Sequence, residues 1–401
     1  AVNVKYVIVL GDGMADEPIE ALGGKTPLEY ADTPEMDRLA KMSEIGMAHT
    51  IPKGMAPGSD TANLAVLGYD PKIYYTGRSP LEALSIGVDM APDDVALRCN
   101  FVTLTEDEAC YEERTIVDHS SGEISTEDAA VLLAAVKEAL ETDTYRFYTG
   151  TSYRHLLIWR GGSVIDLVPP HDKLGQVIGE FLPENKVLYE MMKKSYDILV
   201  DHPINIARKA AGKNPANAIW FWGAGTKPSL TSFKDKTGKD GVMISAVDLL
   251  KGIAVGAGME NIIVPGANGG LDTNYRGKAE AAVKALLGGK DFAYIHVEAP
   301  DEMGHQGSYE RKIQAIEHLD REVIAEVCAG LDNAGEDYRL LIMPDHPTPV
   351  AVRTHTSDPV PFLLYDSTAP LQKEQHYNER EAKQSGLEVM EGYRLIDQLL
   401  Q

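Results

Sequence analysis

Length, composition and charge already exclude several classes of protein. The chain has 401 residues, and 44% of them are hydrophobic, which is enough for large cores and too much for a mainly disordered chain. The 38 Lys and Arg against 61 Asp and Glu give a formal charge of −23. This charge argues against nucleic-acid or membrane-surface partners, because both are anionic.

The cysteines and the N-terminal segment indicate a cellular compartment. Cys99, Cys110 and Cys328 are scattered and form no CxxC pair, which favours a reducing compartment over a disulfide framework. The segment 1–10 has no cationic start and reads as a short buried strand rather than a signal peptide. No run approaches the roughly 18 apolar residues of a membrane-spanning helix. We therefore expect a cytoplasmic protein.

Short apolar runs alternate with amphipathic stretches along the chain. The predicted strands are, in chain order, Tyr6–Leu10, Ala218–Trp222, Ile262–Val264, Phe292–Val297, Leu340–Met343 and Pro361–Tyr365. The predicted helices are Pro34–Lys41, Thr126–Leu140, Ser245–Val255, Arg311–Leu331 and Glu388–Leu400. This alternation is typical of an α/β protein with a largely parallel sheet.

The middle of the chain differs in residue composition from its two ends. Acidic loops and a helix occupy Asp93–Thr149, and Arg146–Arg160 is rich in basic and aromatic residues. A Lys/Asp/Gly-rich connection follows at Phe233–Gly241. We interpret the middle as an inserted domain. The expected division is residues 1–85 for the first part of a core, 86–235 for the insertion and 236–401 for the second part of the core.

Three aspartates, Asp12, Asp301 and Asp345, each come shortly after a predicted strand. Ligands of open α/β sheets bind outside the carboxyl ends of the strands, so the three carboxylates are expected on one rim. Each aspartate alone also fits a simpler role, because Asp beside Gly or Pro is a common turn former.

Histidines near these aspartates favour a metal site. Asp301 and His305 are four residues apart and would share one face of a helix. His346 is adjacent to Asp345, and His355 follows nine residues later. A lone histidine is more often structural, but carboxylates mixed with imidazoles suit Mn²⁺, Zn²⁺ or Fe²⁺ better than Mg²⁺.

Ser59 is the candidate nucleophile. It follows a Pro-Gly turn and opens a helix-like run, so it lies at or near a helix N-cap, where serine is also favoured for purely structural reasons. Beside two divalent ions its hydroxyl would lose its proton near neutral pH and attack phosphorus. With Ser59 the candidate ligands number seven, which exceeds one tetrahedral site and indicates two ions. Spacing alone leaves the two roles of Ser59 open.

Several ordered motifs resemble those of the archaeal-type cofactor-independent phosphoglycerate mutases, which belong to the alkaline phosphatase superfamily. The motifs are Gly11–Asp16 (GDGMAD), Leu22–Leu28 (LGGKTPL), Pro57–Asp60 (PGSD), Leu67–Pro71 (LGYDP), Tyr75–Arg78 (YTGR), Val297–His305 (VEAPDEMGH), Pro344–Pro349 (PDHPTP) and Arg353–His355 (RTH). The resemblance runs nearly from end to end of the chain.

The resemblance implies a fold, a reaction and a set of ligands. The fold would be an alkaline-phosphatase-like three-layer α/β core with a mainly parallel sheet, interrupted by a smaller inserted α/β substrate domain. The enzyme would interconvert 3-phosphoglycerate and 2-phosphoglycerate, in glycolysis and gluconeogenesis, through a phosphoserine and without 2,3-bisphosphoglycerate. One metal would be held by Asp12, Ser59, Asp345 and His346, and the other by Asp301, His305 and His355. Family members commonly use Mn²⁺, and some use Zn²⁺, Co²⁺ or Mg²⁺.

The inserted domain is expected to recognise the rest of this small phosphorylated metabolite. Arg154 is the first candidate for gripping its carboxylate or phosphate, and His155 is the candidate proton carrier. Further candidates for substrate binding or proton transfer are Arg98, Asn100, Asp118, His119 and Lys227. Each of these side chains also fits an ordinary surface or interdomain ion pair.

Three other functions remain open from the sequence. Val117–Thr126 and Arg146–Arg160 are similar to a bacterial branch of the group that has been proposed to contain homoserine kinases, so a homoserine phosphotransferase is one alternative. No GxxxxGK[ST] loop is present to bind a nucleoside triphosphate in the usual way. A metal-dependent phosphomonoesterase on the same core is the second alternative, and a non-enzymatic metal-binding scaffold is the third. The sequence predicts no oligomeric state.

Overall fold

The computed structural model describes residues 3–401, which divide into two compact units. One unit combines the chain up to Tyr75 with Ser229–Gln401, and the other is Thr76–Pro228. The second unit therefore begins and ends earlier than the predicted 86–235. Its early start reflects α5 (Arg78–Ser85), which packs on two strands of the second unit, and Ser79 on α5 donates a hydrogen bond of 2.6 Å to the carbonyl of Gly223.

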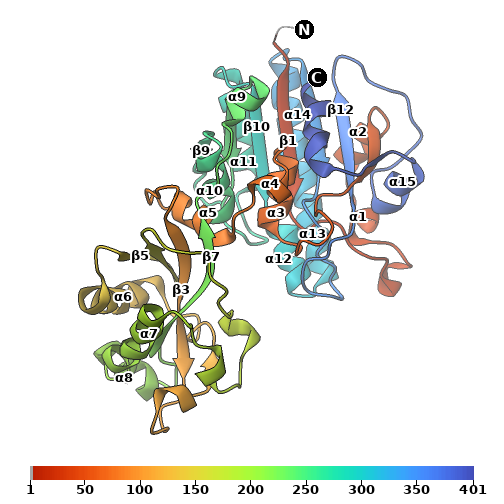
Figure 1. Cartoon of the computed structure of the whole chain (residues 1–401). Coiled ribbons are helices and arrows are strands. Elements are labelled where there is room, and N and C mark those ends of the chain that lie inside the picture. The colour runs from red at the N-terminus through yellow and green to blue at the C-terminus, as the bar shows by residue number, and fades with distance from the viewer. Residues whose placement is uncertain (1–2) are drawn as a thin grey trace. The chain divides into compact units, whose positions relative to one another are not determined.

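The first unit contains an eight-stranded sheet in the order β13-β2-β12-β11-β1-β10-β8-β9 (Figure 1). Its strands are β1 (Lys5–Gly11), β2 (Glu44–Ala48), β8 (Gly241–Ile244), β9 (Glu260–Ile262), β10 (Phe292–Val297), β11 (Tyr338–Met343), β12 (Val360–Asp366) and β13 (Glu388–Val389). All neighbouring pairs are parallel except those that β12 makes with β11 and β2. The predicted α/β fold with a mainly parallel sheet is confirmed.

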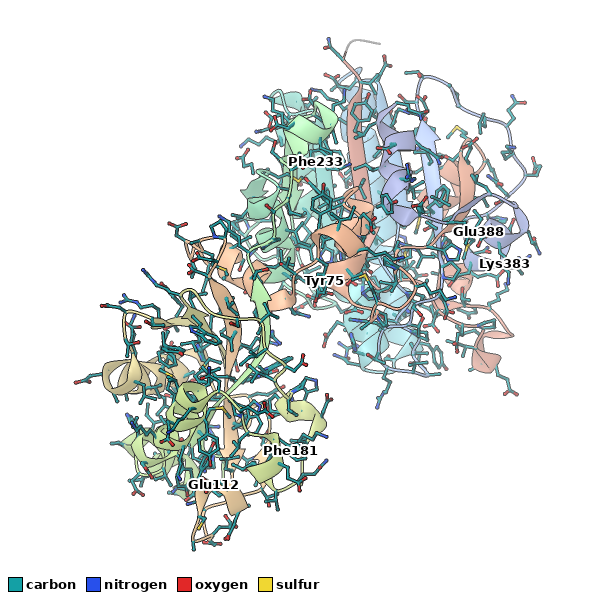
Figure 2. The ribbon with its side chains drawn as sticks, viewed as in Figure 1. Tyr75, Glu112, Phe181, Phe233, Lys383 and Glu388 are labelled. Carbon is teal, nitrogen blue, oxygen red and sulfur yellow. The ribbon has the colours of Figure 1, made fainter. Side chains whose placement is uncertain are left out.

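The central strands of this sheet are covered on both faces. Val7 and Val9 of β1 belong to a core shared with α2, α11, α13 and α14, while Ile8 and Leu10, which point to the opposite face, are equally buried. The helices of the unit are α1 (Pro27–Tyr30), α2 (Pro34–Ala40), α3 (Ser59–Val66), α4 (Pro71–Tyr74), α9 (Phe233–Thr237), α10 (Asp248–Gly256), α11 (Tyr275–Leu287), α12 (Ala299–His305), α13 (Tyr309–His318), α14 (Ala325–Asn333), α15 (Glu379–Gln384) and α16 (Leu395–Leu400). One contact between a helix and the sheet is that of Phe233 on α9, labelled in Figure 2, with Phe292 on β10, whose ring centroids are 4.7 Å apart.

The agreement between predicted and observed elements depends on local packing. The strand Phe292–Val297 and the helix Thr126–Leu140 have their predicted bounds. The predicted helix Glu388–Leu400 is wrong, because its first residues form β13 against β2 and only Leu395–Leu400 is α-helical. A short 3-10 turn at Gly392–Arg394 precedes this helix, and a side chain at Gly392 would meet the carbonyl of His49 at 2.4 Å.

The second unit is built on an antiparallel sheet. Its strands are β3 (Val95–Leu104), β4 (Ile116–Asp118), β5 (Tyr145–Thr151), β6 (Arg154–Trp159) and β7 (Ala218–Thr226), with β3 paired to β4, β6 and β7. The helices α6 (Thr126–Leu140), α7 (Lys186–Leu199) and α8 (Pro203–Ala210) accompany it. Residues of α6 and α7, such as Leu132 and Met192, share a core with β3 and β7. Within residues 3–401, no helix is long and apolar enough to cross a membrane.

Glu379 at the start of α15 makes the stability of the first unit depend on pH. Burial raises the pKa of this carboxyl to about 7, although hydrogen bonds from the Thr26 hydroxyl and the Asp16 amide act in the opposite direction. The folded state thus holds the proton more tightly than the unfolded state. The free energy of unfolding is expected to fall by roughly 3 kcal/mol through this group as the pH rises from about 4.5 to about 7.

Glu379→Gln should remove this component of the pH dependence. We expect the difference in unfolding free energy between wild type and variant to change by that amount between about pH 5 and pH 8, as measured by chemical denaturation. Glu381→Gln, on the same helix, is the matched control and should follow the wild-type profile. Parallel pH profiles for Glu379→Gln and wild type would contradict the prediction.

Candidate functional site

The three predicted aspartates lie at one edge of the parallel sheet. Asp12 follows β1, Asp345 follows β11, and Asp301 lies on α12 directly after β10. Because β1 is hydrogen-bonded to β10 on one side and to β11 on the other, all in parallel, these three strands end at the same edge. The topology therefore gathers side chains that are up to 333 residues apart.

Asp12, Asp345 and His346 form one group of metal-type donors, whose ligand atoms lie within 4.8 Å of one another. The Nε2 atom of His346 is 3.4 Å from Asp12 Oδ1 and 3.2 Å from Asp345 Oδ2. Asp345 is fixed through Oδ1, which accepts hydrogen bonds from the amides of Gly13 and His346. Asp12 Oδ2 contacts His296 Nε2 at 2.9 Å, whereas Asp12 Oδ1 is buried without a hydrogen-bond partner among the described residues.

The second group contains Asp301, His305 and His355. On α12, His305 Nε2 lies 3.2 Å from Asp301 Oδ2, so the expected shared helical face is present. His355 Nε2 lies 3.3 Å from Asp301 Oδ1 and 3.1 Å from His305 Nε2. His346 is within reach of this group too, since its ligand atom lies within 4.8 Å of those of Asp301 and His355. His346 thus stands between the two groups.

The electrostatics of the two groups differ. Burial, together with the charges of Asp345 and Asp301, raises the pKa of Asp12 well above its ordinary value. Burial also opposes ionisation of Asp301, but hydrogen bonds from His305 and His355 outweigh it and hold the pKa of that carboxyl well below its ordinary value. The carboxylate surplus, the mixed O and N donors and the unpartnered Asp12 Oδ1 fit divalent ions of the Mn²⁺ or Zn²⁺ type.

Ser59 does not cap its helix. The N-cap of α3 is Gly58, and Ser59 is the first helical residue, so the purely structural role of the hydroxyl is not used. Its Oγ atom instead lies 3.0 Å from His346 Nε2. Asn63, one turn further on, donates hydrogen bonds to the Ser59 carbonyl and to Asp345 Oδ2, which ties the start of α3 to the metal-type donors.

The second unit contains all the side chains expected to bind the rest of the substrate. Arg154 is exposed at the start of β6, with its guanidinium 5.0 Å from the ring of Tyr153. Arg98 is largely buried and makes two hydrogen bonds to Glu82, of 2.5 and 3.2 Å, so its charge is already compensated within this unit. Arg154 is therefore the better placed of the two arginines to meet an anion.

The expected role of His155 as a proton carrier does not fit its surroundings. Its side chain is 1% exposed, its Nδ1 accepts a hydrogen bond from the Gly150 amide, and its Nε2 contacts the Ser152 carbonyl at 2.8 Å. Burial lowers its pKa to about 4. Because successive residues of a strand point to opposite faces, His155 lies inside the hairpin while Arg154 faces outward. His155 has a structural role in this hairpin.

The remaining candidates of this unit have different environments. Asp118 accepts hydrogen bonds from the amides of Ser120 and Gly122 and from Asn214, as a turn-forming aspartate does. Lys227 lies on the surface just after β7. Asn100 Oδ1 and His119 Nδ1 are buried and have no hydrogen-bond partner within residues 3–401. Unpartnered polar atoms of this kind are typical of a site that receives a ligand or water.

Two residues next to His119 were not identified from the sequence. The ring of His171 lies 6.1 Å from that of His119 and 5.3 Å from that of Trp222, whose indole Nε1 is also buried without a partner in the described chain. The guanidinium of Arg98 stacks over the same indole at 4.9 Å. The only signal for His171 in the sequence is its position after two prolines, which does not distinguish it from a loop residue.

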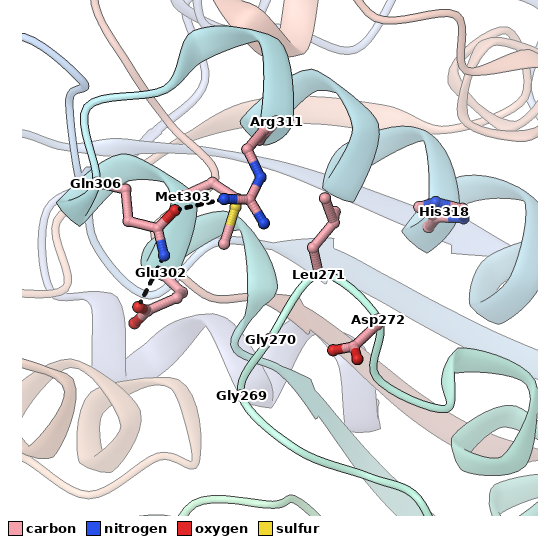
Figure 3. A pocket seen from close by; sticks show the side chains of 9 residues that line it. All are labelled: Gly269, Gly270, Leu271, Asp272, Glu302, Met303, Gln306, Arg311 and His318. Carbon is pink, nitrogen blue, oxygen red and sulfur yellow. Dashed lines mark hydrogen bonds between the residues drawn. The ribbon is translucent and has the colours of Figure 1, made fainter.

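A cavity of about 730 Å³ adjoins α12 but is lined by other residues than the metal-type donors (Figure 3). Across it, Arg311 donates a hydrogen bond to Gln306, and Gln306 donates one to Glu302. The polar residues that line it are exposed or half-buried, and this chain of hydrogen bonds uses several of them. The cavity has the character of a surface hollow, in contrast to the buried donors around His346.

Comparisons with known proteins agree with this arrangement. The model of the 2,3-bisphosphoglycerate-independent phosphoglycerate mutase family matches residues 40–205. A probable 2,3-bisphosphoglycerate-independent phosphoglycerate mutase of Geobacter sulfurreducens is 48% identical over 99% of this chain and 100% of its own length. The enzyme of that name from Methanosarcina barkeri is 47% identical over 98% of both chains.

Solved structures show the same similarity. A protein of Pyrococcus horikoshii matches with a TM-score of 0.83 and 31% identity, over 99% of this chain and 97% of its own. A cofactor-independent phosphoglycerate mutase of Thermoplasma acidophilum matches with a TM-score of 0.67 and 27% identity, over 99% of both chains. Fold and site together define an α/β enzyme with candidate ligands for divalent metals at the carboxyl edge of its sheet. The chain belongs to the family of 2,3-bisphosphoglycerate-independent phosphoglycerate mutases.

Proposed function

We propose that this protein interconverts 3-phosphoglycerate and 2-phosphoglycerate through a phosphoserine at Ser59. The observation that carries the proposal is the position of Ser59 Oγ, 3.0 Å from His346 Nε2 and so beside both groups of metal-type donors. Family membership supports the same reaction. The substrate is a small phosphorylated metabolite of glycolysis and gluconeogenesis, and the three free cysteines are consistent with work in the reducing cytoplasm.

Two divalent ions, Mn²⁺ first among them, are proposed for the centre. Asp12, Asp345, His346 and Ser59 would hold one ion, and Asp301, His305 and His355 the other. When bound, such ions neutralise phosphoryl oxygens and lower the pKa of a nearby hydroxyl, which activates a serine without a dedicated general base.

The proposed reaction has two symmetrical halves. Ser59 Oγ forms a bond to phosphorus while the bond between phosphorus and the 3-oxygen of the substrate breaks. The proton lost by Ser59 is balanced by the proton that the 3-oxygen gains, so glycerate is left with a free 3-hydroxyl. The 2-hydroxyl of the same glycerate then takes the phosphoryl group from Ser59, which regains its proton. The position of Ser59 in the first turn of α3 supports this scheme, because the free amides of a helix N-terminus favour a phosphate. No 2,3-bisphosphoglycerate is needed, since the serine stores the phosphoryl group.

The unit Thr76–Pro228 is proposed to carry the groups that bind the glycerate part of the substrate. Arg154 supplies a cation for the carboxylate. His119, whose Nδ1 is buried without a partner within residues 3–401, and the neighbouring His171 are the candidate proton carriers. Trp222 adds an apolar wall with an indole N–H that is free to donate. His119 and His171 are thus proposed as proton carriers in place of His155.

Arg154→Ala should weaken substrate binding far more than metal binding. Loss of one charge-assisted hydrogen bond is expected to raise KM by about 10- to 100-fold, with Mn²⁺ affinity unchanged. Steady-state kinetics and metal titration measure the two effects. Arg146→Ala is the control, because Arg146 lies in the same unit but is half-buried and paired with Glu141. An unchanged KM in Arg154→Ala would remove Arg154 from the site.

The reaction itself is tested by incubating the Mn²⁺-loaded protein with 3-phosphoglycerate, without 2,3-bisphosphoglycerate, and following the ³¹P spectrum. Formation of 2-phosphoglycerate without free phosphate is expected. Free phosphate alone would mean that water reaches the phosphoserine and that the protein is a phosphomonoesterase. If 3-phosphoglycerate does not react, the protein is incubated with ATP and homoserine. Phosphorylation of homoserine would then show that homoserine is the acceptor.

A further inference from the structure

Lys312 on α13 is a charged side chain that is completely buried and has no place in the scheme above. Its Nζ atom donates three hydrogen bonds: 3.1 Å to the carbonyl of Ala15, 3.0 Å to the carbonyl of Thr348 and 2.9 Å to Asp16 Oδ2. An ammonium group has three protons, so these acceptors use all of them. Lys312 is thus fully satisfied, and its geometry is fixed.

The three acceptors belong to the two loops that carry metal-type donors. Ala15 and Asp16 follow Asp12 after β1, and Thr348 follows Asp345 after β11. The loops also bond to each other, since the Thr348 amide donates to the Ala15 carbonyl at 3.2 Å. The Val350 amide donates to the same Asp16 oxygen that receives Lys312. Lys312 is the point at which α13 joins both loops.

Thr348 extends this connection into the donor groups. While its carbonyl is held by Lys312, its hydroxyl donates a 2.5 Å hydrogen bond to Asp301 Oδ1. The same Oγ1 lies 3.3 Å from Nδ1 of His346, on the side of the ring away from Ser59. Thr348 therefore connects the buried ammonium of Lys312 to Asp301 in one donor group and to His346 in the other.

Net stabilisation is a weak explanation for this buried ion pair. Desolvating an ammonium and a carboxylate costs about as much as their attraction returns, so apolar side chains of similar volume often stabilise a protein equally well. Hydrogen bonds are directional, so this ion pair fixes the positions of the atoms that it contacts, which apolar side chains would not do. We therefore look for its role in the geometry of the two loops.

We propose that Lys312, with Asp16 and Thr348, is a positioning residue for the metal centre, which it holds by fixing the two loops that present the metal ligands. The proposal rests on the proposed function only in requiring that the centre binds divalent ions. Hydrogen-bond partners behind metal ligands commonly change metal affinity by 10- to 100-fold when they are removed.

The test is the Mn²⁺ affinity of the purified full chain, measured by isothermal titration. The double variant Asp16→Asn/Lys312→Met removes both charges and so avoids leaving one of them buried and unpaired. We expect it to fold, by circular dichroism and thermal unfolding, and to bind Mn²⁺ about 10- to 100-fold more weakly. Thr348→Val keeps the ion pair and removes only the hydroxyl, and about a tenfold loss is expected from it.

Asp320→Asn is the matched control for a loss of stability alone. Asp320 is as buried as Lys312 and lies on the same run of helix, but its carboxylate accepts hydrogen bonds from the amides of Glu35 and Met36, away from the metal-type donors. We expect Asp320→Asn to lower the unfolding temperature and leave Mn²⁺ affinity unchanged.

Each result decides for or against the proposal. A folded double variant that binds Mn²⁺ like wild type would overturn it, as would a normal affinity in Thr348→Val if the double variant does not fold. An Asp320→Asn variant as weak in Mn²⁺ binding as the double variant would mean that stability, not position, is responsible. Failure of the wild type to bind Mn²⁺ would refute the metal centre as well, whereas binding without turnover of phosphoglycerate would refute only the proposed reaction.

Discussion

Ser59→Ala should abolish phosphoryl transfer while leaving the fold and the metal content intact. We expect turnover to fall by roughly 10⁴-fold or more, because the covalent step loses its nucleophile. The fold should survive, since Ser59 does not cap α3 and its Oγ contacts the metal-type donor His346. Steady-state kinetics measures the loss, and mass spectrometry of quenched reactions should find a phosphorylated Ser59 peptide in wild type alone.

The matched control for this variant is Ser232→Ala. Ser232 lies in the same unit and does cap its helix, α9, by accepting a hydrogen bond from the amide of Asp235. Its replacement should cost about 1 kcal/mol of stability and leave turnover unchanged. Turnover close to wild type in Ser59→Ala would refute the phosphoserine mechanism, and a phosphoryl group found on another residue would identify the true nucleophile.

Removal of divalent ions should stop the reaction and destabilise the first unit. In the absence of an ion, burial of Asp12 and the charges of the nearby Asp345 and Asp301 raise its pKa well above the ordinary value. A bound dication relieves the repulsion, and at a hundredfold excess over Kd it stabilises the folded state by about 2.7 kcal/mol per site. We therefore expect chelator-treated protein to be inactive, to unfold at a lower temperature and to recover both properties on addition of Mn²⁺.

Variants separate this effect from a general response to ions. Asp345→Asn should lose most of the Mn²⁺-induced rise in unfolding temperature, because it removes a charge from the donor group around His346. Asp272→Asn, which changes an exposed aspartate lining the cavity beside α12, should keep the whole rise. Equal responses of the two variants would show that the ion acts elsewhere, and full activity after chelation would refute the metal dependence.

Much of the site could be predicted from the sequence because its signals are local. Asp301 and His305 share a helical face through their spacing alone, and the apolar runs before Asp12 and Asp345 identify the strand ends that carry them. Ordered motifs then indicated the family, which the relatives confirm. Phe292–Val297 and Thr126–Leu140 were predicted within their bounds, because hydrophobic periodicity in each is uninterrupted.

Tertiary structure decided the features that depend on distant partners. Glu388–Leu400 has a helical pattern, yet its start pairs with β2 instead, because a neighbouring edge strand offers hydrogen bonds that the pattern does not record. Arg98 and His155 have the residue types of a substrate site, but burial against Glu82 and within a hairpin commits them to the fold. Local spacing does not reveal such partners.

Periodicity and short motifs were enough to predict the class of fold and the family, and to name the candidate metal ligands. The contact of Ser59 with His346 in place of a capping role, and the reach of Lys312 to the loops after β1 and β11, depend on packing between distant segments. Lys312 lies in an ordinary amphipathic helix and is separated from Ala15 by 297 residues. The arrangement of strands in the sheet brings together residues that are far apart in the sequence. This arrangement depends on how the strands and helices pack, which local sequence patterns do not record.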